Sequence, residues 1–401
     1  MATFSLAGAR VAVQERAHRR ASTWTRLGGQ IAFCLAALVL LVSGGAPPPG
    51  LRVEQMAASR AFPLVDWHLD RLAERFGRIG PALLGAGPSP TDADRAAVAA
   101  YFAAKPVERP VLASAAEAGI ERAVSTVLRG EGVERPAFWA PDGEMLFPPV
   151  SFAFTAPPEV LIVSRRDTID VVQSPLLRPG IPDADAERLE ADVDAQGYSS
   201  LVVPIGGLAT YPTMVLEGQR PLDAVIAVTH EWVHGYLFFT PLGRRYWSSQ
   251  DARTINETTA EMISRELGPR AARDLGIESP SPAARSSSQV PQPQPSQIQF
   301  RALMRETRVK LDALLRDGKI DEAEAYLRDR RQDFLAAGFQ IRKFNQAYFA
   351  FYGSYGDGAS GVNPIPRQLG WLRTASGSPG EFLRRVGQLT SADDLARAVG
   401  E

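Results

Sequence analysis

Residues 224–239 read Ala-Val-Ile-Ala-Val-Thr-His-Glu-Trp-Val-His-Gly-Tyr-Leu-Phe-Phe, an apolar stretch interrupted by His230, Glu231 and His234. Such a run predicts a buried helix, in which residues four positions apart lie on one face, one turn apart. His230 and His234 are therefore expected to present two imidazole nitrogens to one metal ion. The alternative is a chance match on a core helix, but buried polar groups are costly unless they have partners.

Glu231 is the candidate acid–base residue beside the two histidines. It lies beside them on the helix, angled to reach a water molecule on the metal rather than the metal itself. Zinc lowers the pKa of such a water, and a carboxylate beside it can take the proton. The sequence therefore predicts a catalytic Zn²⁺ site, with Glu231 as general base and then general acid.

A catalytic zinc needs a third protein ligand. The chain has four histidines and one cysteine, Cys34, which lies in an apolar N-terminal segment. No histidine follows His234, so the ligand must be a carboxylate unless His68 folds back to the site. The next expected helix offers Glu257 and Glu261 in the sequence Asn-Glu-Thr-Thr-Ala-Glu.

His-Glu-x-x-His followed by Asn-Glu-x-x-x-acid on the next helix resembles the gluzincin pattern of thermolysin-like peptidases and zinc aminopeptidases. That resemblance implies that Glu257 is the third metal ligand. It also implies that Glu261, one turn on, accepts a hydrogen bond from a ligating histidine. The family usually has an aspartate at the position of Glu261.

A second stretch is similar to a motif near the C-terminus of a bacterial family of predicted aminopeptidases. It consists of Phe344, Asn345 and Ala347, followed by Tyr355. With the zinc motif, the matching segments cover roughly residues 200–268 and 340–390. The resemblance makes Tyr355 a candidate hydrogen-bond donor to the tetrahedral oxyanion. The alternative is an aromatic helix packed in the core.

Gly206, Gly207 and Leu208 precede the zinc helix. In gluzincins an edge strand at this position pairs with the substrate backbone, and glycine permits close approach. We therefore expect these three residues to bind substrate. A plain strand and turn is the alternative.

The N-terminus combines arginines with an apolar segment. Residues 1–26 contain Arg10, Arg16, Arg19, Arg20 and Arg26, and a mostly apolar run extends to residue 46. We expect a single transmembrane signal anchor with the arginine-rich side in the cytoplasm and the catalytic domain outside it, periplasmic or extracellular. A cleaved signal peptide is the alternative, because residues 43–46 are small.

The net charge of −1 argues against a nucleic-acid partner. Residues 278–297 are rich in Pro, Gln and Ser and are expected to be disordered. The fold class expected is α+β, mostly α, with a zincin-like catalytic core and a small sheet after the N-terminal transmembrane helix. The regions expected are a basic leader (1–26), the anchor (27–46), a helical region (51–148), the zincin core (149–275), the linker (278–297) and a helical region completing the active-site cleft (298–401).

Periodicity gives the individual elements of this fold. The elements expected are strands at 160–163, 169–172 and 201–205, and helices at 183–195, 222–239, 252–267, 299–317, 320–336 and 340–352, with short helices over 363–399.

The function expected is zinc-dependent hydrolysis of peptide bonds in a peptide or protein substrate, and the second resemblance would make the enzyme an aminopeptidase. Two alternatives stay open. One is a membrane-tethered zinc-binding scaffold without activity, and the other is an amide hydrolase that acts on a non-peptide substrate. Glu231 argues against the scaffold, because a purely structural zinc site does not need it.

Overall fold

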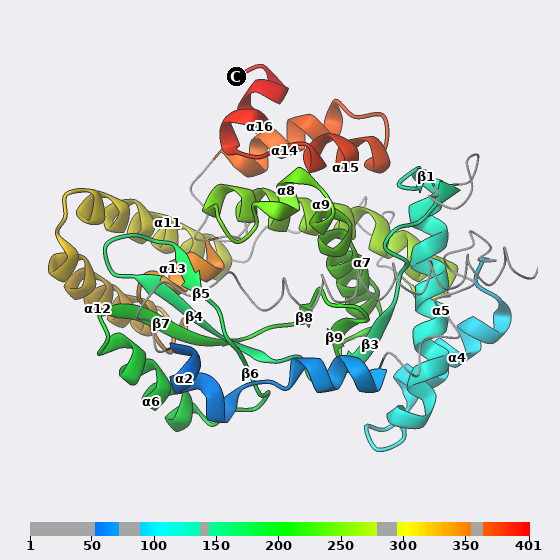
Figure 1. The fold of residues 1–401 in the computed structure, drawn as a ribbon, viewed down its shortest axis with the longest axis horizontal. Coiled ribbons are helices and arrows are strands. Elements are labelled where there is room, and N and C mark those ends of the chain that lie inside the picture. Colours follow the sequence, from blue (N-terminus) through cyan, green and yellow to red (C-terminus); the bar gives the residue numbers. More distant parts are fainter. Residues whose placement is uncertain (1–52, 72–88, 137–143, 279–294, 354–363) are drawn as a thin grey trace, which may run out of the picture. The chain divides into compact units, whose positions relative to one another are not determined.

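The helix that carries the two histidines, α7 (Pro221–Phe238), packs along α9 (Gln250–Asp274) (Figure 1). Ser249 caps the start of α9, because its side-chain oxygen accepts a hydrogen bond from the Ala252 N–H. Gly268 lets the helices approach closely, since a Cβ there would lie 2.9 Å from Ile226 Cα. The computed structural model describes residues 53–71, 89–136, 144–278, 295–353 and 364–401.

Three short strands form a sheet beside α7 in the order β3-β9-β8. The strands are β3 (Phe152–Thr155), β8 (Gly207–Leu208) and β9 (Thr213–Leu216). β3 runs parallel to β9, and β8 runs antiparallel to it. Within the described residues, β8 pairs with no strand other than β9, so it is an edge of this sheet.

The opposite edge of that sheet is closed by side chains of α5 (Arg109–Gly130). Glu121 and Glu117 lie one helical turn apart, and both are buried. The Glu121 carboxylate accepts a hydrogen bond from the backbone N–H of Phe152 at 3.0 Å, and the Glu117 carboxylate accepts one from Phe154 at 2.9 Å. The carboxylates therefore satisfy backbone donors of β3 that would otherwise be unpaired.

A second, antiparallel sheet is built around β4. Its strands are β4 (Glu159–Arg165), β5 (Val171–Gln173), β6 (Leu176–Leu177) and β7 (Tyr198–Pro204). Alternate residues of β4 face opposite sides of the sheet. Leu161 and Val163 pack with α6 (Asp183–Asp194), whereas Val160 and Ile162 pack with α13 (Gln346–Tyr352).

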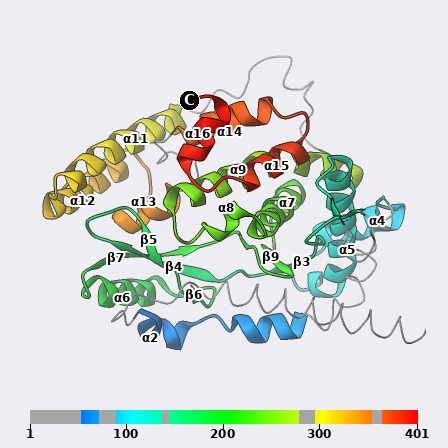
Figure 2. The same cartoon turned by 45° about the horizontal axis from the view of Figure 1, so that its top comes forward.

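Helices and short strands complete the described part of the chain. They are α2 (Val53–Ala57), η1 (Ala58–Arg60), α4 (Asp92–Ala103), β1 (Arg135–Pro136), β2 (Glu144–Met145), α8 (Pro241–Arg244), α11 (Pro295–Arg316), α12 (Ile320–Ala336), α14 (Ile365–Thr374), α15 (Pro379–Gly387) and α16 (Ala392–Val399). α14 and α16 contact α9, and α15 contacts α8 and α9 (Figure 2). All described elements belong to one compact unit, residues 46–401.

The largest hydrophobic core joins parts of the chain that are far apart in sequence. It includes Ile120 of α5, Phe152 of β3, Val233 of α7, Ile263 of α9 and Phe382 of α15. The three regions expected at 51–148, 149–275 and 298–401 therefore share one core. Burial of this joint surface, rather than of each region alone, stabilises the frame around α7 and α9.

The expected fold class, α+β and mostly α, is confirmed in the described residues. One expected helix, 340–352, is wrong at its start, because α13 begins only at residue 346. The Asn345 side chain accepts a hydrogen bond from the Tyr348 N–H and caps the helix there. α11 begins at Pro295, so the last three residues of the expected 278–297 linker are helical.

The expected leader and anchor, residues 1–46, lie outside the described residues, as does most of the expected linker. Among the helices that the structure describes, none has the length and apolar character needed to cross a bilayer.

Candidate metal centre

Helix α7 places His230 and His234 one turn apart on the side that faces α9. Their rings meet edge to face, with centroids 4.7 Å apart, and their Nε2 atoms are 3.0 Å apart. Both side chains are largely buried, with 15% and 13% of their surface exposed. The apolar residues of this helix pack into the core and leave the two imidazoles directed toward α9.

Glu257 of α9 brings a carboxylate oxygen to the same point. Its Oε2 lies 3.7 Å from His230 Nε2 and 3.4 Å from His234 Nε2. Three ligands in a tetrahedral arrangement around zinc, with bonds near 2.0–2.1 Å, have donor atoms about 3.3 Å apart. The three observed separations, 3.0, 3.4 and 3.7 Å, bracket that value. The residues present therefore form a group that fits a metal ion.

The outer nitrogens of the two imidazoles face oxygen atoms. Asn256 Oδ1 lies 2.6 Å from His234 Nδ1, so Nδ1–H donates to the amide oxygen and Nε2 is the nitrogen that faces the other donors. Glu261 Oε2 lies 3.7 Å from His230 Nδ1, too far for a hydrogen bond, and Glu261 also pairs with Arg265. Glu261 thus faces His230 without the expected hydrogen bond, while Asn256 accepts the close hydrogen bond from His234.

Tyr246, in the connection between α8 and α9, is a further residue of the site that the sequence did not indicate. Its hydroxyl donates a 2.6 Å hydrogen bond to Glu257 Oε1, which leaves Oε2 directed toward the histidines. Its ring also meets His234 edge to face, with centroids 6.3 Å apart. Tyr246 therefore fixes which oxygen of Glu257 faces the imidazole pair.

The electrostatics of the site couple its acid and its bases. Burial alone would lower the pKa of His234, but the neighbouring Glu257 carboxylate outweighs it and raises the pKa of His234 to about 9. Burial would raise the pKa of Glu257, yet the two imidazoles hold it well below its ordinary value. A metal ion and a proton compete for the same nitrogen of His234, so the affinity for a metal ion should rise as that proton is lost.

Glu231 lies against the edge strand β8. A Cβ built on Gly207 would be 2.5 Å from Glu231 Oε1 and 2.9 Å from its Cδ. Only glycine leaves room for the carboxyl group there. Burial raises the pKa of Glu231 above the ordinary value for a glutamate. A base with a raised pKa takes a proton more effectively near neutral pH.

Of the three residues expected to bind substrate, Gly207 and Leu208 form β8, and Gly206 directly precedes it. The backbone N–H of Leu216 donates a hydrogen bond to the Gly206 carbonyl at 3.0 Å. A Cβ on Gly206 would meet no atom within 4 Å, in contrast to Gly207. These residues therefore form and precede an edge strand that touches Glu231, and their binding of substrate stays a prediction.

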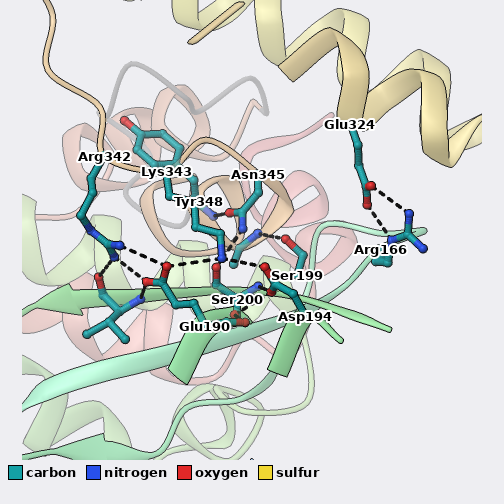
Figure 3. Close-up of polar contacts among 12 residues, drawn as sticks. Arg166, Glu190, Asp194, Ser199, Ser200, Glu324, Arg342, Lys343, Asn345 and Tyr348 are labelled. Carbon is teal, nitrogen blue, oxygen red and sulfur yellow. Dashed lines mark hydrogen bonds and ion pairs between the residues drawn. The ribbon is translucent and has the colours of Figure 1, made fainter. Parts of the chain in front are cut away.

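The segment that contains Asn345 has structural contacts (Figure 3). Asn345 Nδ2 donates a 2.8 Å hydrogen bond to the Ser200 carbonyl of β7, in addition to capping α13. Lys343 pairs with Asp194 at 2.7 Å, and Arg342 pairs with Glu190 of α6. This segment therefore anchors α13 on the β4 sheet. Tyr355, the candidate oxyanion donor, lies outside the described residues.

His68, the alternative third ligand, is buried, and its Nδ1 lies 2.6 Å from the Leu64 carbonyl oxygen. Among the described residues, the group of donors that could hold a metal comprises His230, His234 and Glu257, without His68.

No protein-family model matches the chain, and no curated protein or solved structure is significantly similar to it. What supports a function for this chain is therefore the geometry of its own residues.

Proposed function

We propose that the protein is a zinc-dependent metallopeptidase of the gluzincin type, anchored to a membrane by its N-terminal segment. The observation that carries the proposal is the convergence of His230, His234 and Glu257 beside a buried carboxyl group, Glu231, at an edge strand. Two imidazoles and one carboxylate are a ligand set that catalytic zinc ions use, with one position left for the reaction.

In this proposal, each residue has one role. His230, His234 and Glu257 would hold a zinc ion, which would acidify a bound water and polarise the carbonyl group of the substrate. Glu231 takes the proton of the attacking water and then delivers it to the leaving amine. Asn256 and Tyr246 hold His234 and Glu257 in the orientations that the structure gives them.

The edge strand β8 gives the proposal its substrate class. Gly207 has no side chain, and its backbone lies against Glu231. An extended peptide that pairs with β8 would run past the carboxyl group that activates water. This arrangement favours a polypeptide backbone over other amides, because an edge strand recognises repeating N–H and C=O groups.

The test combines metal content, activity and one conservative substitution. The purified protein should contain about one zinc ion per chain, and it should cleave peptides from a mixed library read by mass spectrometry. Glu231→Gln should keep the zinc and the melting temperature, because Glu231 is not among the three donors. Its activity should fall by about 10²–10⁴-fold or more, because the amide cannot accept the proton.

The outcomes separate the candidates. A Glu231→Gln protein with wild-type activity would refute the mechanism. Full zinc occupancy without cleavage of any amide would indicate a scaffold. Cleavage of small amides without cleavage of peptides would indicate an amide hydrolase for non-peptide substrates. The fragments from the library also show whether the enzyme removes terminal residues, as an aminopeptidase does, or cuts internally.

A further inference from the structure

Arg253 is a buried arginine without an acidic partner in the part of the chain that the structure describes. It lies on α9 one turn before Glu257, and only 6% of its surface is exposed. Its Nη1 donates a hydrogen bond to Gln250 Oε1 at 2.9 Å. Two other arginines of α9, Arg265 and Arg270, pair with glutamates.

The guanidinium of Arg253 lies over two aromatic rings. Its Cζ is 5.6 Å from the ring centroid of Tyr246 and 6.0 Å from that of Trp247. These contacts hold the planar group in place and partly compensate its burial. They do not neutralise its charge. Trp247 is 44% exposed, whereas Tyr246 touches the candidate metal centre, so the rings extend from the centre to the surface.

The position of Arg253 in its helix adds to the local positive charge. It lies in the first turns of α9, a helix of 25 residues, where the helix dipole is positive. A cation at this end of a helix is disfavoured, and a buried charge without a counter-ion is costly. Both costs fall when an anion binds. Arginine suits a carboxylate in particular, because its N–H groups match the two oxygens.

We propose that Arg253 binds a carboxylate of the peptide substrate, either its C-terminal carboxylate or an acidic side chain near the cleaved bond. The inference rests on the proposed peptidase function and names the substrate class of the same site. A short series of contacts connects Arg253 with the candidate metal centre. The guanidinium lies over Tyr246, whose hydroxyl donates to Glu257, and Glu257 faces both histidines.

Three matched peptides test this proposal and separate the two sources of the carboxylate. One has a free C-terminus and an internal glutamate, one has a C-terminal amide instead, and one has glutamine for the glutamate. Wild-type protein should cleave the first peptide at least about 30-fold more efficiently, in kcat/KM, than the peptide that lacks the recognised carboxylate. Arg253→Gln should abolish that preference and change cleavage of the neutral peptide less than about threefold.

The matched control is Arg273→Gln, which removes the same charge from an exposed position at the other end of α9. This variant should keep the wild-type preference. Arg253→Gln should melt at or above the wild-type temperature, since it removes a buried charge that has no acidic partner among the described residues. If Arg253→Gln loses cooperative melting, the arginine has a structural role and the proposal is overturned. It is also overturned if the wild type cleaves all three peptides equally.

A binding experiment keeps this test independent of the proposed function. Two zinc-loaded proteins, the Glu231→Gln variant and the double variant Glu231→Gln/Arg253→Gln, are each titrated calorimetrically with the same three peptides. Tighter binding of the peptide with the carboxylate, lost in the double variant, supports the role of Arg253 even if the wild type cleaves nothing. If the three peptides bind with equal affinity to both proteins, the role of Arg253 is overturned, whether or not the wild type is a peptidase.

Discussion

Gly207 and Gly206 are neighbours that differ in one respect, the space beside them. A Cβ at Gly207 would overlap the Glu231 carboxyl group, whereas a Cβ at Gly206 would meet nothing within 4 Å. The Glu231 side chain is flexible enough to move aside, so Gly207→Ala should not unfold the protein. It should displace the carboxylate that takes the proton from water.

We therefore predict that Gly207→Ala lowers peptide cleavage by about 10²-fold or more while zinc content and melting temperature stay near wild type. Gly206→Ala is the control with the same change in side chain, and it should retain nearly full activity. Both variants are compared by kcat/KM on one peptide and by thermal melting. Equal activities of the two variants would contradict the contact that the structure gives Gly207.

Tyr246 acts on the donor group through one hydrogen bond, which it donates to Glu257. Tyr246→Phe removes only the hydroxyl that holds Glu257 Oε1, so the carboxylate loses its fixed orientation. Zinc affinity, measured by competition with a chelator, should fall by about 10–100-fold. Tyr352→Phe removes a hydroxyl on α13 and should leave zinc affinity unchanged. Unchanged affinity in Tyr246→Phe would show that α9 alone orients Glu257.

Among the elements, α13 illustrates a motif whose contacts are structural. Asn345 caps this helix and ties it to β7 with a second hydrogen bond. Asn345→Ala loses both, and we expect the free energy of unfolding to fall by about 1–3 kcal/mol. The measurement is urea denaturation of the zinc-loaded protein. Ser378→Ala removes only the N-terminal cap of α15, so it should lower the free energy of unfolding by less. Zinc affinity should change in neither variant.

The elements also show which parts of the fold were accessible to sequence reasoning. α7 was predictable because its apolar run is long and its histidines have helical spacing. The pairing of β3 with β9 was not, because it joins two short strands about sixty residues apart and neither alternates clearly. Tyr246 was missed for a related reason. It lies in a turn, where spacing gives no direction for a side chain. Asn256 could have been found, because it directly precedes Glu257 in the quoted motif.

At the level of the whole molecule, the N-terminal arginines give the expected orientation. They should stay in the cytoplasm, so the polypeptide after residue 46 should lie outside it. A reporter that is active only outside the cytoplasm, fused after Glu401, should give a signal. Replacing the five arginines of the leader by glutamine should weaken that signal. Activity of a reporter that works only in the cytoplasm, fused at the same position, would show that the orientation is the opposite one.

The carboxylates of Glu117 and Glu121 have a consequence for the behaviour of the molecule in a crowded solution. A free strand edge is a template on which a second copy can add a strand and begin to aggregate. The edge of β3 offers no such template, since its inner N–H groups are already bonded to α5. The other edge, β8, is the one with which the proposed substrate pairs. Within the described residues, the β3 side of the sheet beside α7 is therefore protected from adding a strand of a second copy.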